Sequence, residues 1–161
     1  MKRIIQLIFN FFGYKVMRYQ SIRTHYNPEE LIDYLSYNKQ PLIFDVGANA
    51  GQSIEIYKKL FPESIIHSFE PNSYELNKLL IKYKDNNKII LNNYAVGEKE
   101  EENIEFNINV KSGNSSFYNV TKNTTWLKKR AETYGVEPDE YTAKKIIVKK
   151  ITLDNYSEKK K

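Results

Sequence analysis

The sequence of 161 residues contains no cysteine and only two histidines, His25 and His67. Without thiols, the chain cannot form disulfides, bind a metal through thiolates or use a cysteine nucleophile. The two histidines lie far apart and match no metal-binding pattern such as H-E-x-x-H, so we expect no metal site. We interpret both as ordinary surface or packing residues.

The chain also lacks a long apolar run. The most apolar stretch, "MKRIIQLIFNFFGY", ends its run by Phe12 and falls well short of the roughly 20 residues that a membrane-spanning helix needs. No A-x-A cleavage pattern follows, which argues against a signal peptide. We expect a helix that packs on the domain, with weak contact with a membrane surface as the alternative. A cytoplasmic protein is the default expectation.

Excess charge of one sign is small, with 25 Lys and Arg against 20 Asp and Glu and a net charge of +5. The lysine runs near the C-terminus lack interleaved aromatic residues, so we expect no nucleic-acid partner. With 40% hydrophobic residues, the composition is typical of one domain that folds in water.

Asn27 and Pro28 predict the start of a helix that ends near Asn38. We therefore divide the chain into an N-terminal helical segment, 1–38, and a domain, 39–161.

Three short apolar segments are typical of strands buried on both faces: "PLIFDV" (41–46), "SIIHSF" (64–69) and "KIILNNYAV" (88–96). Apolar residues at helical spacing fill the two intervals, 54–61 and 76–83. A capping pair, Asn72 with Glu75, marks the start of the second helix. Strand, helix, strand, helix, strand predicts right-handed crossovers and an α/β fold with a Rossmann-like, doubly wound, mostly parallel sheet.

The pattern changes after the third strand. "NIEFNINV" (103–110) alternates as a half-exposed strand, and "GNSSFYNV" (113–120) is its predicted partner in an added antiparallel hairpin. A helix over 125–134 ends at a glycine, and "KKIIVKKITL" (144–153) predicts the last strand. Three parallel strands are half of the usual doubly wound sheet, so we expect a domain that is incomplete at its C-terminus.

The turn after the first strand, "DVGANAG", has the residues of a ligand-binding loop. Gly47 and Gly51 permit unusual dihedral angles and close approach of a ligand, and Asn49 tolerates left-handed geometry. Glu70 ends the second strand 19 residues after Gly51, where a carboxylate accepts hydrogen bonds from ribose hydroxyls. The pair of features indicates a cofactor that contains adenosine.

The dinucleotide pattern G-x-G-x-x-G fits this turn poorly, because Asn49 and Gln52 replace its second and third glycines. A ligand without phosphates suits the turn better than NAD or FAD. Structural alternatives stay open for each residue. Asp45 could cap nearby backbone amides, Glu70 could start the next helix, and the glycines could be plain turn residues.

Four fragments in a fixed order resemble the FkbM family of methyltransferases: "FDVGANAGQ" (44–52), "SFEP" (68–71), "NYAVGE" (93–98) and "ITLDNY" (151–156). The resemblance implies a class I methyltransferase fold that uses S-adenosylmethionine. It implies that Asp45, Gly47, Asn49 and Gly51 surround the methionine part of this cofactor and that Glu70 binds its ribose. It also implies that Asn93 and Ala95 contact its adenine.

We expect from this resemblance an O-methyltransferase that acts on a hydroxyl of a sugar, a glycan or a secondary metabolite. No residue is a convincing catalytic base. In the family, an acidic D-x-E-G motif follows the "TLDNY" element, whereas here nothing follows Lys161. A non-catalytic remnant or interaction module is therefore the alternative. An NAD-dependent oxidoreductase is a third, which the turn disfavours.

Overall fold

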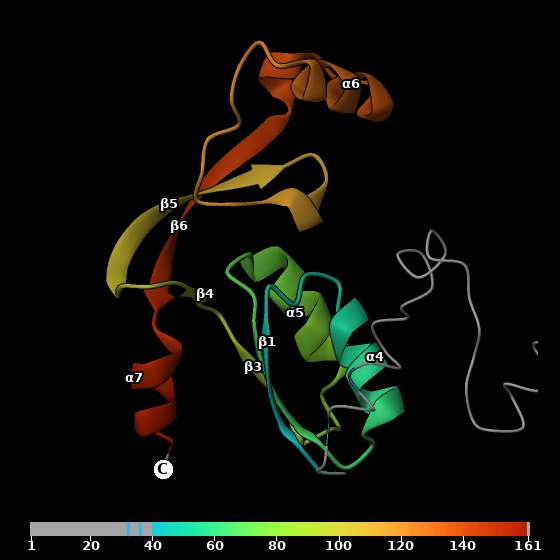
Figure 1. Cartoon of the computed structure of the whole chain (residues 1–161), viewed down its shortest axis with the longest axis vertical. Coiled ribbons are helices and arrows are strands. Elements are labelled where there is room, and N and C mark those ends of the chain that lie inside the picture. The colour runs from blue at the N-terminus through green and yellow to red at the C-terminus, as the bar shows by residue number, and fades with distance from the viewer. Residues whose placement is uncertain (1–31, 33–35, 37–39, 161) are drawn as a thin grey trace, which may run out of the picture. The chain divides into compact units, whose positions relative to one another are not determined.

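The computed structural model describes residues 32, 36 and 40–160. The chain divides into two compact units, Met1–Asn38 and Lys39–Lys161. The helices predicted before residue 39 fall almost entirely outside the described residues. Figure 1 shows the second unit in colours from cyan to red. Within the described residues, no helix combines the length and apolar character needed to cross a membrane.

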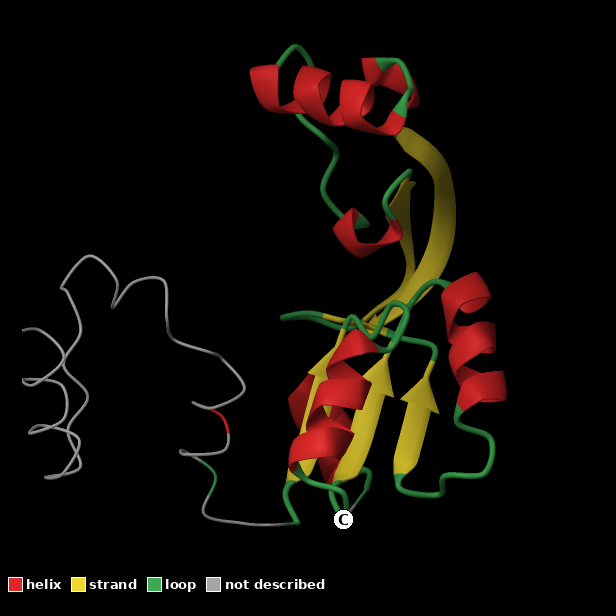
Figure 2. Cartoon of the chain, turned by 90° about the vertical axis from the view of Figure 1, so that its right-hand side faces the viewer, coloured by secondary structure: helices red, strands yellow, loops and turns green. Residues whose placement is uncertain are grey.

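Three parallel strands form the first sheet, in the order β1 (Leu42–Val46), β2 (Ile65–Phe69), β3 (Ile89–Asn92). They alternate with α4 (Gln52–Leu60) and α5 (Ser73–Lys82), as the sequence predicts. Figure 2 shows the three strands running side by side with their arrowheads at one edge. The carboxyl ends of the strands, where ligands bind in such sheets, therefore lie together.

Both connecting helices pack on the same face of this sheet. Ile54 of α4 and Leu79 of α5 are almost fully buried and share one apolar cluster with Ile66 and Ile89 of the strands. α5 begins at Asn72, whose side chain accepts the Tyr74 N–H at 3.1 Å. Burial of these aliphatic side chains supplies about 2 kcal/mol each, which holds the helices on the strands.

A second sheet has the order β4 (Ala95–Val96), β6 (Thr142–Ile151), β5 (Glu101–Asn109). β4 pairs with β6 in parallel, and β5 pairs with β6 antiparallel. The single strand predicted over 88–96 is thus two strands, β3 and β4, that belong to different sheets. The break at residues 93–94 carries the chain from one sheet to the other.

The predicted hairpin partner of β5 is wrong. Residues 112–114 form the short helix η1 (Ser112–Asn114), and one isolated bridge, between Asn107 and Ser116, takes the place of the predicted strand ladder. Side chains supply the other bonds between this segment and β5, since the Asn109 N–H donates to Ser115 Oγ at 3.2 Å. The antiparallel partner is β6, more than 30 residues later in the chain.

The segment between β5 and β6 holds α6 (Thr125–Tyr134) and the short helix η2 (Pro138–Glu140). Thr124 caps the start of α6, and Gly135 ends it in a left-handed conformation with φ 66°, as the sequence predicts. The Tyr141 side chain is completely buried beneath this segment. It contacts Trp126 edge-to-face, with ring centres 5.8 Å apart.

The chain ends differently from the prediction, because the last strand stops at Ile151 and a helix follows, α7 (Leu153–Glu158). Thr152 caps this helix by accepting the Asn155 N–H at 3.2 Å. Tyr156 then packs edge-to-face against Phe69, on the opposite face of the first sheet from α4 and α5. The α/β class with a parallel sheet is confirmed, whereas the doubly wound arrangement and the C-terminal truncation stay predictions.

Candidate functional site

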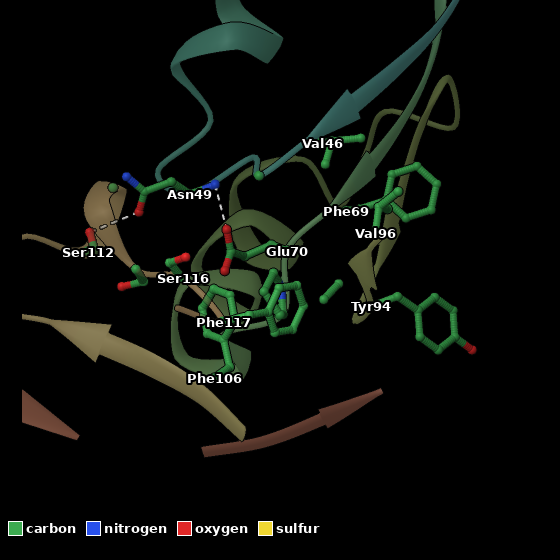
Figure 3. A pocket seen from close by; sticks show the side chains of 15 residues that line it. Val46, Asn49, Phe69, Glu70, Tyr94, Val96, Phe106, Ser112, Ser116 and Phe117 are labelled. Atoms are coloured by element: carbon green, nitrogen blue, oxygen red, sulfur yellow. Dashed lines mark hydrogen bonds between the residues drawn. The ribbon is translucent and has the colours of Figure 1, made fainter. Parts of the chain in front are cut away.

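A cavity of about 230 Å³ lies at the carboxyl ends of β1 and β2. One wall is the glycine turn with Gly47 and Asn49, and the end of β2 with Glu70 adjoins it. The second sheet and the segment 112–117 supply the opposite wall (Figure 3). Small-molecule sites typically have about 300 to 1,000 Å³, so an open cavity of this size suits part of a cofactor rather than all of it.

The glycine turn adopts the left-handed geometry expected of it. The φ angles are 83° at Gly47, 44° at Asn49 and 84° at Gly51. The N–H groups of Gly47 and Ala48 both donate to the Phe69 carbonyl, at 2.9 and 3.1 Å, and Gly51 N–H donates to the Ala48 carbonyl at 2.7 Å. These bonds fix the turn to β2. They also leave these amides unavailable to a phosphate group.

The two glycines play different parts. A Cβ atom at Gly47 would meet no atom within 4 Å, which places this residue against open space in the cavity wall. A Cβ atom at Gly51 would lie 2.9 Å from Leu79 Cδ2 and 3.2 Å from the Tyr83 hydroxyl. Gly51 therefore permits α4 and α5 to approach each other, and it does not line the cavity.

Glu70 is buried at the end of β2, with 6% of its surface exposed. Its Oε2 accepts the Asn49 N–H and its Oε1 accepts the Asn72 N–H, both at 2.8 Å (Figure 3 draws the first). Burial raises the pKa of the Glu70 carboxyl, and the two amide donors offset part of that rise. Each carboxylate oxygen has a second lone pair, so Glu70 can still accept hydrogen bonds from a ligand in the cavity.

Of the remaining predicted residues, one lines the cavity and two do not. Ala95 of β4 is buried and lines the cavity. Asp45 is buried, does not line the cavity and accepts the Ser68 hydroxyl at 3.1 Å. Asn93 also lies outside the lining, since its amide donates to the carbonyls of Glu70 and Pro71 at 2.9 and 3.1 Å. The cavity thus brings together Gly47, Asn49, Glu70 and Ala95.

The sequence did not identify the residues of the second wall. Phe106 and Phe117 meet edge-to-face with ring centres 5.2 Å apart, and both line the cavity. Ser112 Oγ donates to Asn49 Oδ1 at 2.9 Å and so joins η1 to the glycine turn. Apolar residues in a strand predict only that the strand packs against a core. No local sequence pattern predicts a contact between residues 63 positions apart.

The lining favours a nucleoside without phosphates. Among the described residues, Glu70 is the only charged one that lines the cavity, and no lysine or arginine joins it. A pyrophosphate would face a carboxylate and no cation, which is unfavourable in a partly buried site. Ribose hydroxyls and a positively charged sulfonium both complement a carboxylate. The aromatic wall provides an apolar surface on which a flat base can stack.

Comparison with known proteins identifies the family of this chain. Residues 45–161 match the sequence profile described as the Methyltransferase FkbM domain. None of the curated proteins compared with the chain matches it. A crystal structure of methyltransferase FkbM from Methylobacillus flagellatus KT is similar, with 22% identity and a TM-score of 0.38. The match covers 44% of the present chain and 20% of that protein, so the chain spans about a fifth of its length.

Proposed function

The chain belongs to the FkbM methyltransferase family, and from this premise we propose that it binds S-adenosylmethionine in the cavity beside Glu70. In this proposal the protein methylates a hydroxyl of a sugar, a glycan or a secondary metabolite. The observation that carries the proposal is the buried carboxylate of Glu70. It faces a cavity that is edged by the glycine turn and has no lysine or arginine in its described lining.

The residues of the chain divide the binding task. Ionised Glu70 accepts hydrogen bonds from the two ribose hydroxyls, while its amide donors hold it in place. Gly47 allows the ligand to lie close to the main chain, because no side chain intervenes. Phe106 and Phe117 cover the apolar part of the ligand and exclude water from it.

S-adenosylmethionine held by Glu70 and the glycine turn would supply an activated methyl group to the acceptor hydroxyl, whose proton would pass to water. The chain's contribution is alignment, which accounts for much of the rate of such transfers. The lining holds one carboxylate and no imidazole among the described residues, so we assign no catalytic base.

Isothermal titration of the chain with S-adenosylmethionine and with S-adenosylhomocysteine tests the proposal. The Glu70→Ala variant should bind either ligand about tenfold or more weakly, because hydrogen bonds to a charged group contribute about 1.5 to 3 kcal/mol. Glu132→Ala, on the exposed surface of α6, is the matched control and should bind normally. Failure of both ligands to bind the folded wild-type chain would refute the proposal.

We propose a small-molecule or glycan acceptor and a cytoplasmic location. A membrane-surface contact through residues 1–14 would involve residues outside the described part of the chain. The alternative, a non-catalytic module, gains no support from the comparisons. Methyl transfer by the chain would exclude it directly.

A further inference from the structure

A second cavity, of about 380 Å³, adjoins the cofactor cavity. It lies between the segment 114–121 and the start of α6, and Ser116 lines both cavities. Figure 3 shows Ser116 beside Phe117 and facing the same space as Glu70.

The lining of the second cavity is uncharged, and it presents more apolar than polar surface to the open hollow. It combines the amides of Asn109, Asn114 and Asn119 with the hydroxyls of Thr121 and Thr124, and it has no acidic or basic member. This is unusual in a chain in which 28% of residues are charged. A phosphate, carboxylate or ammonium group would lose its hydration there and gain no counter-charge. The cavity thus favours a neutral ligand that forms many hydrogen bonds.

Two aromatic rings stand at this cavity with large exposed surfaces. Tyr118 is 82% exposed and Trp126 is 50% exposed, although both are large side chains that commonly bury their rings. Trp126 is nevertheless held in place by its edge-to-face contact with buried Tyr141. A rigid, exposed ring loses little conformational entropy on binding, so it suits stacking against a flat apolar face of a ligand.

The same buried tyrosine orients one of the amides. Asn114 Nδ2 donates to the Tyr141 hydroxyl at 3.1 Å, which leaves Asn114 Oδ1 as an acceptor. Asn119 Oδ1 accepts from buried Asn107 at 3.3 Å, which leaves its amide protons as donors. No hydrogen bond within the described residues uses Asn114 Oδ1 or Asn119 Nδ2. Oriented donors and acceptors of this kind match hydroxyl groups, which both donate and accept.

We propose that the second cavity binds a neutral sugar ring. One face of the pyranose stacks on Tyr118 beside Trp126, and its hydroxyls pair with the side-chain amides of Asn114 and Asn119. The binding of this ring does not rest on the proposed function.

Tryptophan fluorescence provides the test, because Trp126 is the single tryptophan of the chain. The folded chain is titrated with glucose, galactose, mannose, fucose and N-acetylglucosamine, and with glucuronate and glucosamine as charged counterparts. We expect a saturable change of Trp126 emission with at least one neutral sugar, at weak, millimolar affinity because one stacked ring buries little surface. Saturation-transfer NMR on the same samples supplies a second readout.

Two variants locate the site. Tyr118→Ala should weaken binding about three- to tenfold, the size expected from loss of one stacked ring. Tyr74→Ala removes a similarly exposed tyrosine, 68% exposed, from α5 and should leave binding unchanged. Loss of binding in neither variant, or equal loss in both, would overturn the location.

The remaining outcomes separate this inference from the proposed function. Binding of S-adenosylhomocysteine without binding of any neutral sugar would overturn the inference and leave the cofactor site intact. Sugar binding without nucleoside binding would leave a sugar site and refute the proposed binding of S-adenosylmethionine. Tighter binding of glucuronate or glucosamine than of every neutral sugar would overturn the inference that the ligand is neutral.

Discussion

At the scale of single residues, Glu70 has a structural role and, in the proposed function, a ligand-binding role as well. Its carboxylate connects the glycine turn to the start of α5 through Asn49 and Asn72. The two interpretations of this residue that the sequence leaves open are therefore compatible. A carboxylate already oriented by two backbone amides needs little reorganisation to accept ribose hydroxyls, which favours tight binding.

The protonation of Glu70 gives a pH-dependent prediction. Burial raises the pKa of this carboxyl, and the charges of Glu75 and Asp45 raise it further. As pH falls, Glu70 takes up a proton before ordinary carboxyls, whose pKa is about 4.3, and one acceptor oxygen becomes a donor. The affinity for S-adenosylhomocysteine should therefore decrease as pH falls from 7 toward the raised pKa.

Titration calorimetry at several pH values measures this decrease. The Glu70→Gln variant keeps the shape of the side chain but cannot ionise, so its weaker affinity should not follow the same pH profile. The same pH profile in wild type and variant would show that another group titrates. Urea unfolding at each pH confirms that both proteins stay folded.

The sequence predicts the local features of the site but not the contacts between residues that are far apart in the chain. The positive φ angles at Gly47 and Gly51 follow from residue type, and the spacing to Glu70 follows from a strand-helix-strand unit. Ser112 reaches Asn49 only because β5 and β6 place η1 over the turn. Asn93 has a suitable residue type and position, yet its amide holds the end of β2.

At the scale of elements, the contact between α4 and α5 depends on Gly51. Both Gly51→Ala and Gly47→Ala force alanine into a left-handed conformation, which costs about 1 to 2 kcal/mol. Only at Gly51 does the new Cβ also collide with buried Leu79, and overpacking of that kind costs about 1 to 3 kcal/mol more. Gly51→Ala should therefore lower the free energy of unfolding more than Gly47→Ala does.

Urea denaturation of the two variants provides the measurement, and the pair controls for the backbone strain that they share. Gly47→Ala should instead reduce S-adenosylhomocysteine affinity, because its methyl group enters the cavity wall. Equal destabilisation by the two substitutions would mean that α5 moves aside at no cost.

Element order was predictable up to β3, whereas strand pairing after it was not. The first half alternates strands and helices with short connections, for which one arrangement dominates. β5 has two candidate partners in sequence, and the nearer one, 113–120, is rich in serine and asparagine. Their side chains bond to nearby main-chain groups, since Ser115 Oγ accepts the Asn109 N–H and Ser116 Oγ accepts the Tyr118 N–H. Phe106 of β5 and Val148 of β6 share one buried cluster, which the pairing of β5 with β6 brings together.

At the scale of the whole Lys39–Lys161 unit, the two sheets share a core. Phe69 of the first sheet, Ile151 of the second and Tyr156 of α7 form one buried cluster. The "ITLDNY" fragment therefore has a structural meaning in this chain, since it supplies two of those three residues. A shared core of this kind leads us to expect one cooperative unfolding transition for the unit.

His67 in β2 tests this shared core through a pH dependence. Asn92 Nδ2 donates to the carbonyls of Ser68 and Ile90, so its Oδ1 accepts the Tyr156 hydroxyl at 3.1 Å. The Tyr156 hydroxyl proton is thereby used, and His67 Nδ1, 2.7 Å from the same oxygen, must carry its own proton and donate it. This hydrogen bond links the first sheet to α7.

Burial lowers the pKa of His67, and the nearby positive charge of Lys160 lowers it further. Because the folded pKa lies below the unfolded value of about 6.5, the stabilisation by neutral His67 is fully present above that pH. It is lost as pH falls through the folded pKa. The free energy of unfolding, measured in urea, should therefore decline below about pH 6.5 in the wild type. It should decline less steeply in His67→Asn, because the asparagine amide still donates to Tyr156 but cannot ionise. Parallel pH profiles for the two proteins would show that the pKa of His67 is the same in the folded and unfolded states, which would contradict this prediction.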